Sequence, residues 1–274
     1  MSEILKLKIH KHIMGKYCIN KLYDNPKYYE IAFSFRDIKK EVDVFEEAIK
    51  KFSRIPVKRV LEIGCGNSPH LEELIKRGYE YIGIDLSKTM IKYSQKKASG
   101  IKGSVQLIHT NMVDFSLRTK VDFAYIMLGS LYVKNTNELI SHFDSVSKVL
   151  KKGGLYFLDG CIQFKPSKKY SESWEIDRGG TIVKSTYSTQ IVNSLEQIFE
   201  EVISLNINDK DKTKKIVEKT FKRIIYPQEF LFFIANRKDF EFMGFWNNWN
   251  LSQPLQGTKK VSRPIAIIRK TSYI

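Results

Sequence analysis

Short apolar runs and amphipathic segments follow one another along the first 160 residues. The short runs are bounded by glycine or charged residues, which is typical of buried strands. They lie at residues 60–63, 81–84, 105–108, 121–127 and 155–158. Between them, apolar residues recur at helical spacing, at residues 37–52, 71–75, 87–97 and 137–150. Strands that alternate with helices predict an α/β fold whose sheet is mostly parallel and doubly wound.

The pattern changes character between Cys161 and Ile225. The run Thr181–Val192 is rich in β-forming residues, and Asn206–Lys214 is polar like a turn. These segments predict an antiparallel, β-rich insert after the fifth strand. One segment stays ambiguous, because Leu195, Ile198, Phe199 and Val202 also fit a helix.

Regular patterning returns after the insert. It predicts a helix at Gln228–Asn236 and strands at Phe240–Phe245 and Pro264–Arg269, which completes a Rossmann-like sheet of seven strands. We therefore expect residues 1–55 to form an N-terminal helical lid. Residues 56–160 and 226–274 would form the core, and residues 161–225 would cover the substrate.

Composition excludes several classes of protein. Hydrophobic residues make up 42% of the 274 residues, which is enough for a packed core. We find no apolar run of the roughly 18 residues that a membrane span needs, and the basic N-terminus does not resemble a signal peptide. Three cysteines without a C-x-x-C pair and five scattered histidines predict neither a disulfide framework nor a metal site. We expect a cytoplasmic protein without a membrane partner.

The net charge of +16 allows a polyanionic partner. Lysines are concentrated at residues 6–21 and 210–223, but they also occur throughout the chain. Charge of this kind can equally serve solubility. Nucleic acid therefore stays an open alternative to a small-molecule partner.

A glycine-rich turn follows the first predicted strand, as Gly64-Cys65-Gly66, and Asp85 ends the second strand. Such a turn lets a ligand approach the backbone, and an acid about twenty residues on can bind a ribose diol. The third glycine of the dinucleotide motif is replaced by Pro69, and Glu62 places negative charge near the loop. Both features disfavour a pyrophosphate and suit an adenosine ligand that carries positive charge.

These motifs resemble the class I S-adenosylmethionine-dependent methyltransferases. Residues 61–66 resemble the family's first motif, and residues 84–87, followed by Met90, resemble the second. Residues 111–115, 127–132 and 150–154 stand where the third, fourth and fifth motifs are expected. The resemblance covers residues 23–159 well and residues 226–270 more weakly.

The resemblance implies a role for each matching residue. Gly64 and Gly66, with Glu62 and Cys65 in the same loop, would flank the methionine part of S-adenosylmethionine, and Leu128 would present its backbone there. Asp85 would bind the ribose hydroxyls, and Leu86, followed by Met90, would pack near the adenine. Asn111 would accept a hydrogen bond from the adenine amine through its carbonyl oxygen, with Met112 beside it.

The segment upstream resembles the lid of small-molecule N-methyltransferases, including amino-sugar N,N-dimethyltransferases and glycine N-methyltransferase-like enzymes. It contains Tyr23-Asp24, Tyr28-Tyr29, Phe35-Arg36-Asp37 and Glu41. Arg36 would clamp the carboxylate of the cofactor, and Tyr29 would cover its sulfonium. The alternatives are a solvated arginine and a packed tyrosine.

Aromatic residues suggest where a substrate would bind. We assign Tyr132, Trp174, Tyr226 and Trp246 to the substrate site, with Tyr187 and Trp249 nearby in sequence. Their alternative role is to form the core of the insert. We find no strong catalytic base, since the candidates Tyr132, His70, His109 and Asp159 are isolated residues. Methyl transfer from an activated cofactor does not require one.

The chain lacks the Asp/Asn-Pro-Pro-aromatic segment of enzymes that methylate nucleobase amines, and it lacks a Pro-Cys nucleophile. We therefore favour methylation of nitrogen or oxygen on a small metabolite. An RNA methyltransferase and a non-catalytic cofactor-binding scaffold remain the alternatives. The sequence leaves open whether the chain is a monomer or a homodimer.

Overall fold

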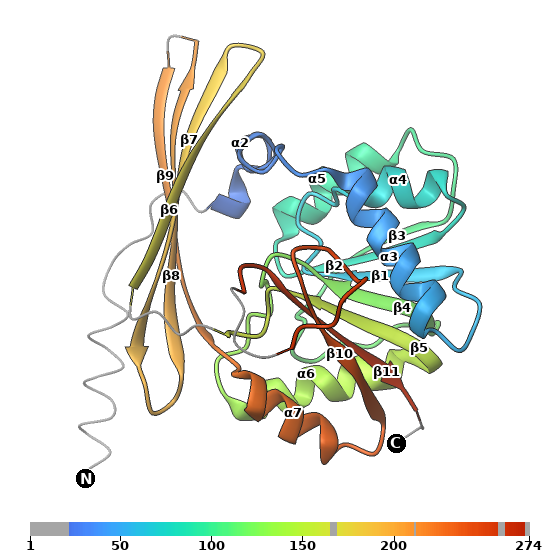
Figure 1. The fold of residues 1–274 in the computed structure, drawn as a ribbon. Helices are drawn as coiled ribbons and strands as arrows, with labels where there is room; N and C mark the ends of the chain where they lie inside the picture. The colour runs from blue at the N-terminus through green and yellow to red at the C-terminus, as the bar shows by residue number, and fades with distance from the viewer. Residues whose placement is uncertain (1–21, 165–168, 211, 257–260, 272–274) are drawn as a thin grey trace.

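The computed structural model describes residues 22–164, 169–210, 212–256 and 261–271. One seven-stranded sheet forms the centre of the molecule (Figure 1), in the order β10-β11-β5-β4-β1-β2-β3. Its strands are β1 (Arg59–Ile63), β2 (Glu80–Asp85), β3 (Val105–His109), β4 (Val121–Ile126), β5 (Leu150–Asp159), β10 (Phe240–Asn247) and β11 (Pro264–Lys270). Only β11 runs antiparallel to its neighbours. The predicted mostly parallel sheet is confirmed.

Helices cover both faces of this sheet. They are α3 (Ile38–Phe52), α4 (Leu71–Lys76), α5 (Lys88–Ala98), α6 (Thr136–Val149) and α7 (Pro227–Ala235). Apolar residues of α6 and α7, such as Phe143 and Phe230, pack in one core cluster. Phe45 of α3 and Leu71 of α4 pack in the other. Because helices press on it from both sides, β4 is buried along its whole length.

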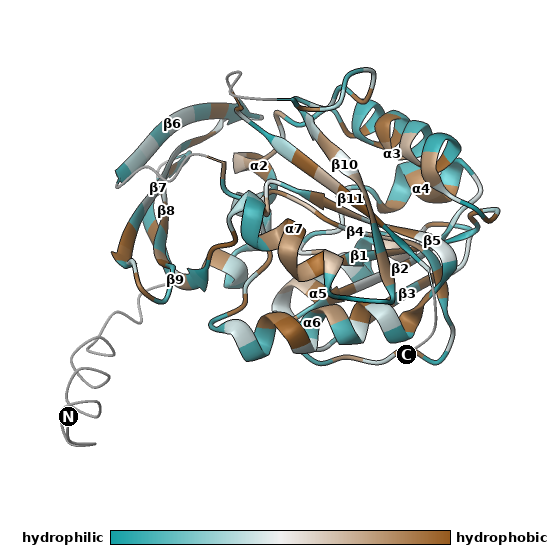
Figure 2. Ribbon diagram, turned by 60° about the horizontal axis from the view of Figure 1, so that its bottom comes forward, coloured by the Kyte–Doolittle hydropathy of each residue, from teal (hydrophilic) through white to brown (hydrophobic). Residues whose placement is uncertain are grey.

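The insert after β5 is a separate antiparallel sheet of four strands in sequence order. The strands are β6 (Lys169–Arg178), β7 (Thr181–Asn193), β8 (Ile198–Asp209) and β9 (Lys212–Arg223). Hydrophobic and hydrophilic residues alternate along them (Figure 2), so the sheet has one buried face. The predicted insert is confirmed.

The structure resolves one detail of the predicted insert and corrects another. The ambiguous segment around Phe199 is strand β8, because Phe199, Ile203 and Leu205 lie on its buried face. The predicted polar turn is too long. Strand β8 continues to Asp209 and β9 begins at Lys212, since Ile207 within the predicted turn and Ile216 just after it are buried.

The N-terminal segment connects the insert to the core. A short 3-10 helix, η1 (Leu22–Asp24), is followed by α2 (Pro26–Ala32). Leu22, Ile31 and Ala32 pack on the apolar face of the insert sheet. On the other side, Glu30 contacts α5 through Tyr93 (2.6 Å) and Lys97 (2.8 Å). Figure 1 accordingly shows α2 between the insert and α5. Residues 1–21 of the predicted lid lie outside the described residues.

Within the described ranges, each helix is too short or too polar to cross a lipid bilayer. In the same ranges, no cluster of His, Cys, Asp or Glu has the composition to hold a metal ion.

Candidate functional site

The strand order reverses between β1 and β4, so their carboxyl ends frame a crevice at the edge of the sheet. The turns that leave β1, β4 and β5 pass through left-handed backbone. Gly64 has φ +68°, Gly129 has φ +65° and Gly160 has φ +68°. Leu128 also has a positive φ, of 55°, which is uncommon for a residue with a side chain. The predicted glycine turn and Leu128 therefore lie at one edge.

The loops after β1, β3 and β4 converge on Gly64. A Cβ atom at this position would lie 3.3 Å from Cε of Met112 and 3.8 Å from Cβ of Ser130. Cys65 points the other way and is buried against Gly83 of β2. Burial raises the pKa of its thiol, so Cys65 can serve the site only through its backbone.

Asp85 joins the glycine turn to the start of α5. Its two carboxylate oxygens accept hydrogen bonds from the backbone N–H of Gly66 (2.8 Å) and of Ser87 (2.7 Å). Burial raises the pKa of Asp85, and these two hydrogen bonds partly oppose that rise. Each oxygen retains lone-pair capacity for a ligand hydroxyl.

The adenine end is only partly as predicted. Leu86 is 66% exposed beside Asp85, which suits packing against a flat ligand. Met90 is fully buried, so its assignment to the ligand surface is corrected. The carbonyl oxygen of Asn111 accepts a hydrogen bond from the N–H of Val113 (3.0 Å). It stabilises its own turn, which differs from the predicted use of that oxygen as a free acceptor.

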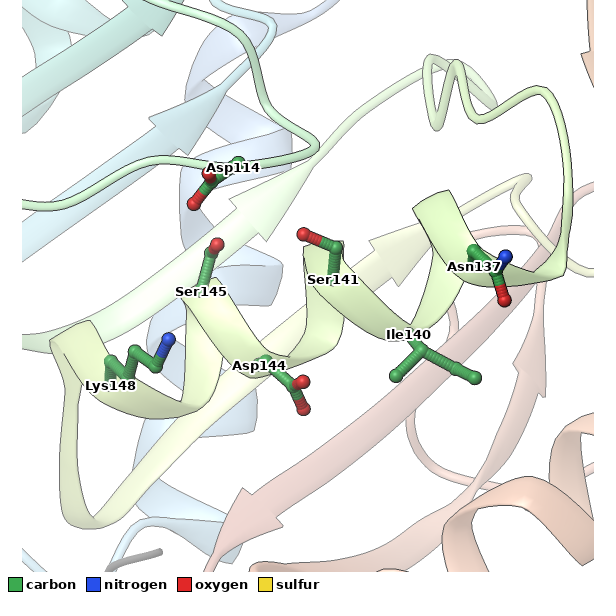
Figure 3. A pocket seen from close by; sticks show the side chains of 7 residues that line it. All are labelled: Asp114, Asn137, Ile140, Ser141, Asp144, Ser145 and Lys148. Atoms are coloured by element: carbon green, nitrogen blue, oxygen red, sulfur yellow. The ribbon is translucent and has the colours of Figure 1, made fainter.

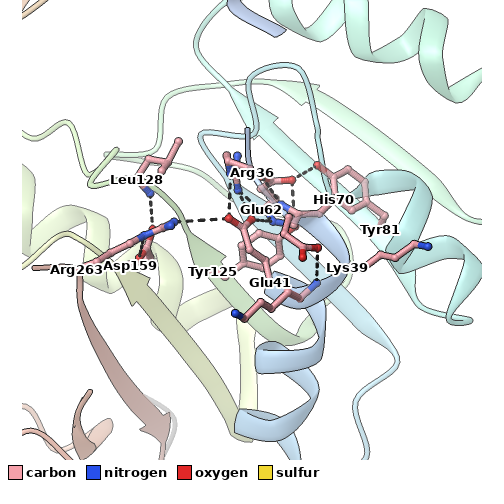
Figure 4. A network of polar contacts seen from close by, with 12 residues as sticks. Arg36, Lys39, Glu41, Glu62, His70, Tyr81, Tyr125, Leu128, Asp159 and Arg263 are labelled. Atoms are coloured by element: carbon pink, nitrogen blue, oxygen red, sulfur yellow. Dashed lines mark hydrogen bonds and ion pairs between the residues drawn. The ribbon is translucent and has the colours of Figure 1, made fainter. Parts of the chain in front are cut away.

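Glu62 is a structural anchor of the glycine turn. Its carboxylate accepts hydrogen bonds from the hydroxyls of Tyr81 (2.5 Å) and Tyr125 (3.0 Å) and lies 3.1 Å from Nδ1 of His70. Figure 4 shows these side chains gathered around Glu62. Because Glu62 is only 3% exposed, the prediction that it faces the ligand is corrected.

Arg36 belongs to the same network. Its guanidinium forms a bidentate pair with Glu41, at 3.1 and 2.5 Å, and Nε2 of His70 lies 2.8 Å from Glu41. Burial opposes ionisation of Glu41, but His70 and Arg36 outweigh it and lower the pKa of Glu41 to about 2. Glu41 therefore already occupies the fork of Arg36, which the sequence assigned to a ligand carboxylate.

A second ion pair supports the turn after β4. Asp159 is fully buried, and Arg263 donates to both of its oxygens at 2.8 Å. One of those oxygens also accepts the backbone N–H of Leu128 at 2.8 Å. Arg263 approaches Glu41 to 3.7 Å and lies over the ring of Trp249. Asp159 thus fixes the turn and leaves no free carboxylate oxygen to act as a base.

The predicted substrate residues separate into two groups. Tyr132, in the loop after β4, donates a hydrogen bond to Glu201 of the insert, and Trp174 lies on strand β6 of the insert, where its indole N–H donates to the carbonyl of Ala32 (2.7 Å). Tyr226 caps helix α7. Trp246 is 2% exposed and packs on Phe52 in the core under α3, so its assignment to the substrate site is corrected.

Glu201 and Lys222 escaped the sequence analysis. Both are buried, and Tyr132 donates a hydrogen bond to Glu201. They lie on neighbouring strands of the insert as one Glu and one Lys among many, so no local signal distinguishes them.

The two histidines considered as possible bases, His70 and His109, differ in their surroundings. His70 is fully buried, whereas His109 is exposed and contacts the carbonyl of Leu86.

A hollow of about 260 Å³ lies elsewhere, between α6 and the loop after β3 (Figure 3). It is lined by Asp114, Asn137, Ile140, Ser141, Asp144, Ser145 and Lys148. None of these residues belongs to the predicted site, and the hollow is shallow and polar.

Comparison with known proteins agrees with the sequence-based resemblance. Residues 60–154 match the family model described as a methyltransferase domain. A putative methyltransferase from Geobacillus is 29% identical over 154 residues, which cover 55% of this chain and 62% of the relative. The chain thus spans less than two thirds of the length of this curated relative.

Two solved structures share the fold over most of the chain. One is an S-adenosylmethionine-dependent methyltransferase from Clostridium acetobutylicum, with a TM-score of 0.73 and 17% identity over 89% of this chain and 96% of that chain. The other is an S-adenosylmethionine-bound amino pentose methyltransferase from Micromonospora echinaspora. It has a TM-score of 0.69 and 16% identity over 93% of this chain and 99% of that chain.

Proposed function

We propose that this chain, which carries a methyltransferase domain at residues 60–154, is an S-adenosylmethionine-dependent methyltransferase acting on nitrogen or oxygen of a small metabolite. One observation supports the proposal most strongly. The glycine turn, the carboxylate of Asp85, the exposed Leu86 and the left-handed turn at Leu128 meet at the crevice between β1 and β4. In open α/β sheets this is the place where ligands bind.

The residues present fit this cofactor. A side chain at Gly64 would fill the space beside Met112, so the glycine keeps the crevice open. Asp85 would hold the ribose hydroxyls, and Leu86 would pack on the adenine. The turn at Leu128 and Gly129 would face the methionine part. Arg36 would contribute by holding Glu41 and the network behind the loop.

The bound cofactor would supply a methyl group already activated by its sulfonium, and the protein would orient the acceptor and exclude water. Tyr29 would contribute to both tasks, orienting the acceptor and excluding water. Burial raises the pKa of its hydroxyl to about 12, so it stays neutral. Its ring lies 4.6 Å from that of Phe33, and Phe33 in turn lies 5.7 Å from Trp174. These rings form an aromatic wall between α2 and the insert.

This wall supports a small acceptor rather than a polymer. We propose that residues 161–225 cover the acceptor and that the N-terminal segment closes the entrance. The amino pentose methyltransferase has the same fold along almost the whole chain, which supports an amine-bearing metabolite as the first class to test.

The ribose assignment is the sharpest test of the cofactor. Asp85→Ala removes the acceptor for two ribose hydroxyls, and each hydrogen bond to a charged group contributes about 1.5–3 kcal/mol. We expect calorimetry with S-adenosylhomocysteine to show affinity reduced by at least about tenfold. Methyl transfer from labelled S-adenosylmethionine to a panel of amines and alcohols is measured beside it.

Asp122→Ala is the matched control. Asp122 is buried more fully than Asp85 and also accepts two backbone N–H groups, of Lys58 and Arg59 at 2.8 Å, but it lies at the start of β4, at the end of the strand away from the glycine turn. It should lose stability without losing affinity. Equal affinity of Asp85→Ala and the wild type contradicts the ribose assignment. Cofactor binding without transfer to any acceptor would favour the scaffold alternative.

A further inference from the structure

A buried ion pair lies where the insert meets the core. Lys222 of β9 places Nζ 2.7 Å from Oε2 of Glu201 on β8 and 2.9 Å from the carbonyl oxygen of Gly129. Glu201 is 3% exposed and Lys222 is 6% exposed. The insert is thereby fastened to the turn after β4, the same turn that faces the proposed cofactor.

Two tyrosines complete this cluster. Tyr132 donates its hydroxyl proton to Oε1 of Glu201, and Tyr187 donates to Oε2 at 2.9 Å. Burial raises the pKa of both hydroxyls, and the charge of Glu201 raises them further, so both stay protonated. Burial alone would also raise the pKa of Glu201, but Lys222 and the tyrosine hydrogen bonds lower it. Glu201 therefore remains ionised and accepts hydrogen bonds from both tyrosine hydroxyls.

This arrangement determines what the tyrosines can offer a ligand. Each hydroxyl uses its only hydrogen in the hydrogen bond to Glu201, so its oxygen offers lone pairs and no donor. Tyr132 also has the hydroxyl of Tyr23 as a hydrogen-bond partner, which leaves one of its two lone pairs for a ligand. A hydroxyl that donates to a carboxylate is also a stronger acceptor, because hydrogen bonds in a chain polarise one another. Both tyrosine side chains are partly exposed above the buried pair. The cluster is therefore neutral overall and offers hydrogen-bond acceptors to a bound ligand.

Contacts of the N-terminal segment link the cluster to the proposed cofactor site. The hydroxyl of Tyr23 is a hydrogen-bond partner of Tyr132, and the ring of Tyr23 lies 5.9 Å from that of Tyr29. Ser130, two residues before Tyr132, lies next to Gly64 of the glycine turn. A group bound at Tyr132 would therefore lie between the insert and the methyl-donating end of the crevice.

We propose that Tyr132, with Tyr187 beside it, accepts a hydrogen bond from the N–H or O–H of the methyl acceptor. Glu201 and Lys222 are positioning residues that keep the hydroxyl hydrogens of both tyrosines directed away from that acceptor. This inference rests on the proposed function and specifies its acceptor site. Directing the acceptor's hydrogen toward Tyr132 leaves its lone pair free to face the methyl group. A neutral amine or alcohol becomes positively charged when it takes the methyl group, and its proton is then released to solvent. An alcohol that has become an ether has no hydrogen left to donate to Tyr132.

The first test measures selectivity for the hydrogen. Protein saturated with S-adenosylhomocysteine is titrated by calorimetry with small primary amines and alcohols. Each alcohol is paired with its methyl ether, and each amine with its quaternary trimethylammonium analogue, because a tertiary amine protonates at neutral pH and regains an N–H hydrogen. At least one donor compound should bind about tenfold more tightly than its methylated analogue, since a site built for a hydrogen bond rejects a ligand that lacks it.

Tyr132→Phe should reduce this ratio to near one while leaving the affinity for S-adenosylhomocysteine unchanged. Tyr170→Phe is the matched control, because Tyr170 also donates to a glutamate of the insert, Glu172, but is exposed. Its ratio should stay at the wild-type value. The proposal is overturned if no donor compound is preferred by the wild type, or if Tyr132→Phe keeps the preference.

The second test separates positioning from folding. Removing one partner of a buried ion pair destabilises a protein, whereas removing both is often tolerated. The double variant Glu201→Leu with Lys222→Met, which removes every acceptor at position 201, should therefore regain thermal stability relative to either single variant. It should still lack the preference for the donor compound, because Tyr132 is no longer held. If the double variant regains both thermal stability and the preference for the donor compound, the ion pair is purely structural and the proposal is overturned.

Glu200 and Lys219 provide the matched control pair on the same two strands. They form an ion pair that is more exposed, with the Lys219 side chain 42% accessible. Glu200→Leu with Lys219→Met should change neither property. Failure of the wild type to bind S-adenosylhomocysteine would count against the proposed function. Retained cofactor binding with an unaltered donor preference in the variants would count against the tyrosine site alone.

Discussion

His70 links the lid to the glycine turn through charge. Its ring nitrogens lie 3.1 Å from Glu62 and 2.8 Å from Glu41, and Arg36 approaches it to 3.2 Å. Burial would lower the pKa of His70, but the two carboxylates outweigh it and raise the pKa. A protonated His70 with Arg36 balances the two acids. The neutral ring leaves one buried carboxylate without a countercharge.

The raised pKa sets the direction of a pH effect on stability. A histidine whose pKa is higher in the folded state stabilises that state below the unfolded pKa of about 6.5, and this contribution is lost as pH rises through the folded value. We expect urea titrations to show that the free energy of unfolding of the wild type decreases as the pH rises from about 6.5 through the folded pKa of His70. His70→Gln should lower it by roughly 3–5 kcal/mol at pH 6, since two buried acids lose a partner.

The pH dependence should also flatten in His70→Gln. His109→Gln is the control, because His109 is exposed and its Nε2 contacts the carbonyl oxygen of Leu86 rather than a buried acid. It should keep the wild-type profile. A wild-type stability that is constant or rises through this range would contradict the charge balance assigned to His70.

Among the elements, the insert leaves the core and returns to it at one place. Its ends meet in a β-bridge between Ile162 and Ile225, and the N–H of Gln163 donates to the carbonyl of Ile225 (2.8 Å). Residues 164–223 can therefore be replaced by a Gly–Ser linker of about six residues, enough to span a bridge of this kind. The loops after β1, β2 and β3 lie outside the deleted segment.

We expect this deletion to keep cofactor binding and to abolish methyl transfer. S-adenosylhomocysteine affinity should fall by no more than about tenfold, because the hydrogen bond from Lys222 to Gly129 is lost. Transfer to the best acceptor of the wild type should become undetectable. Calorimetry and a label-transfer assay measure the two effects, with circular dichroism to establish folding. Transfer at the wild-type rate would show that the insert does not cover the acceptor.

The sequence predicted the order of the elements because each core strand and helix carries a strong local pattern. Strand β4 is apolar throughout, and α6 has a clear buried stripe. Strand β8 was ambiguous because Ile198, Phe199 and Val202 satisfy helical spacing, and only pairing with β7 and β9 decides between the two structures. Local pattern carries no information about such distant pairing.

The site was predicted less completely for a related reason. Asp85 and the glycine turn are close in sequence and could be recognised together. Arg263 and Asp159 are 104 residues apart, and Tyr132 and Glu201 are 69 residues apart. Glu62 looked available to a ligand because its partners Tyr81 and Tyr125 come from neighbouring strands. Folding brought buried partners to side chains that look free in the sequence.

At the scale of the whole molecule, the net charge of +16 bears on the RNA alternative. Lysines such as Lys184 and Lys219 lie on the exposed side of the insert, with 67% and 42% of their side chains accessible. Lys222, in contrast, is buried in an ion pair and is not available to a phosphate. Of these three lysines in the described part of the chain, the two accessible ones lie on the insert, and the one beside the turn after β4 is paired with Glu201.

This distribution predicts binding to nucleic acid without chemistry on it. Lysines that neutralise phosphates release counterions, so affinity for tRNA should fall steeply between roughly 50 and 200 mM salt. A DNA duplex of similar length should bind equally well and with the same salt slope, since neither would be read by sequence. Labelled S-adenosylmethionine should transfer no methyl group to tRNA at any salt concentration. Label in tRNA, or a preference for tRNA over the duplex that survives high salt, would instead favour an RNA methyltransferase, because screening removes surface attraction but leaves a specific site occupied.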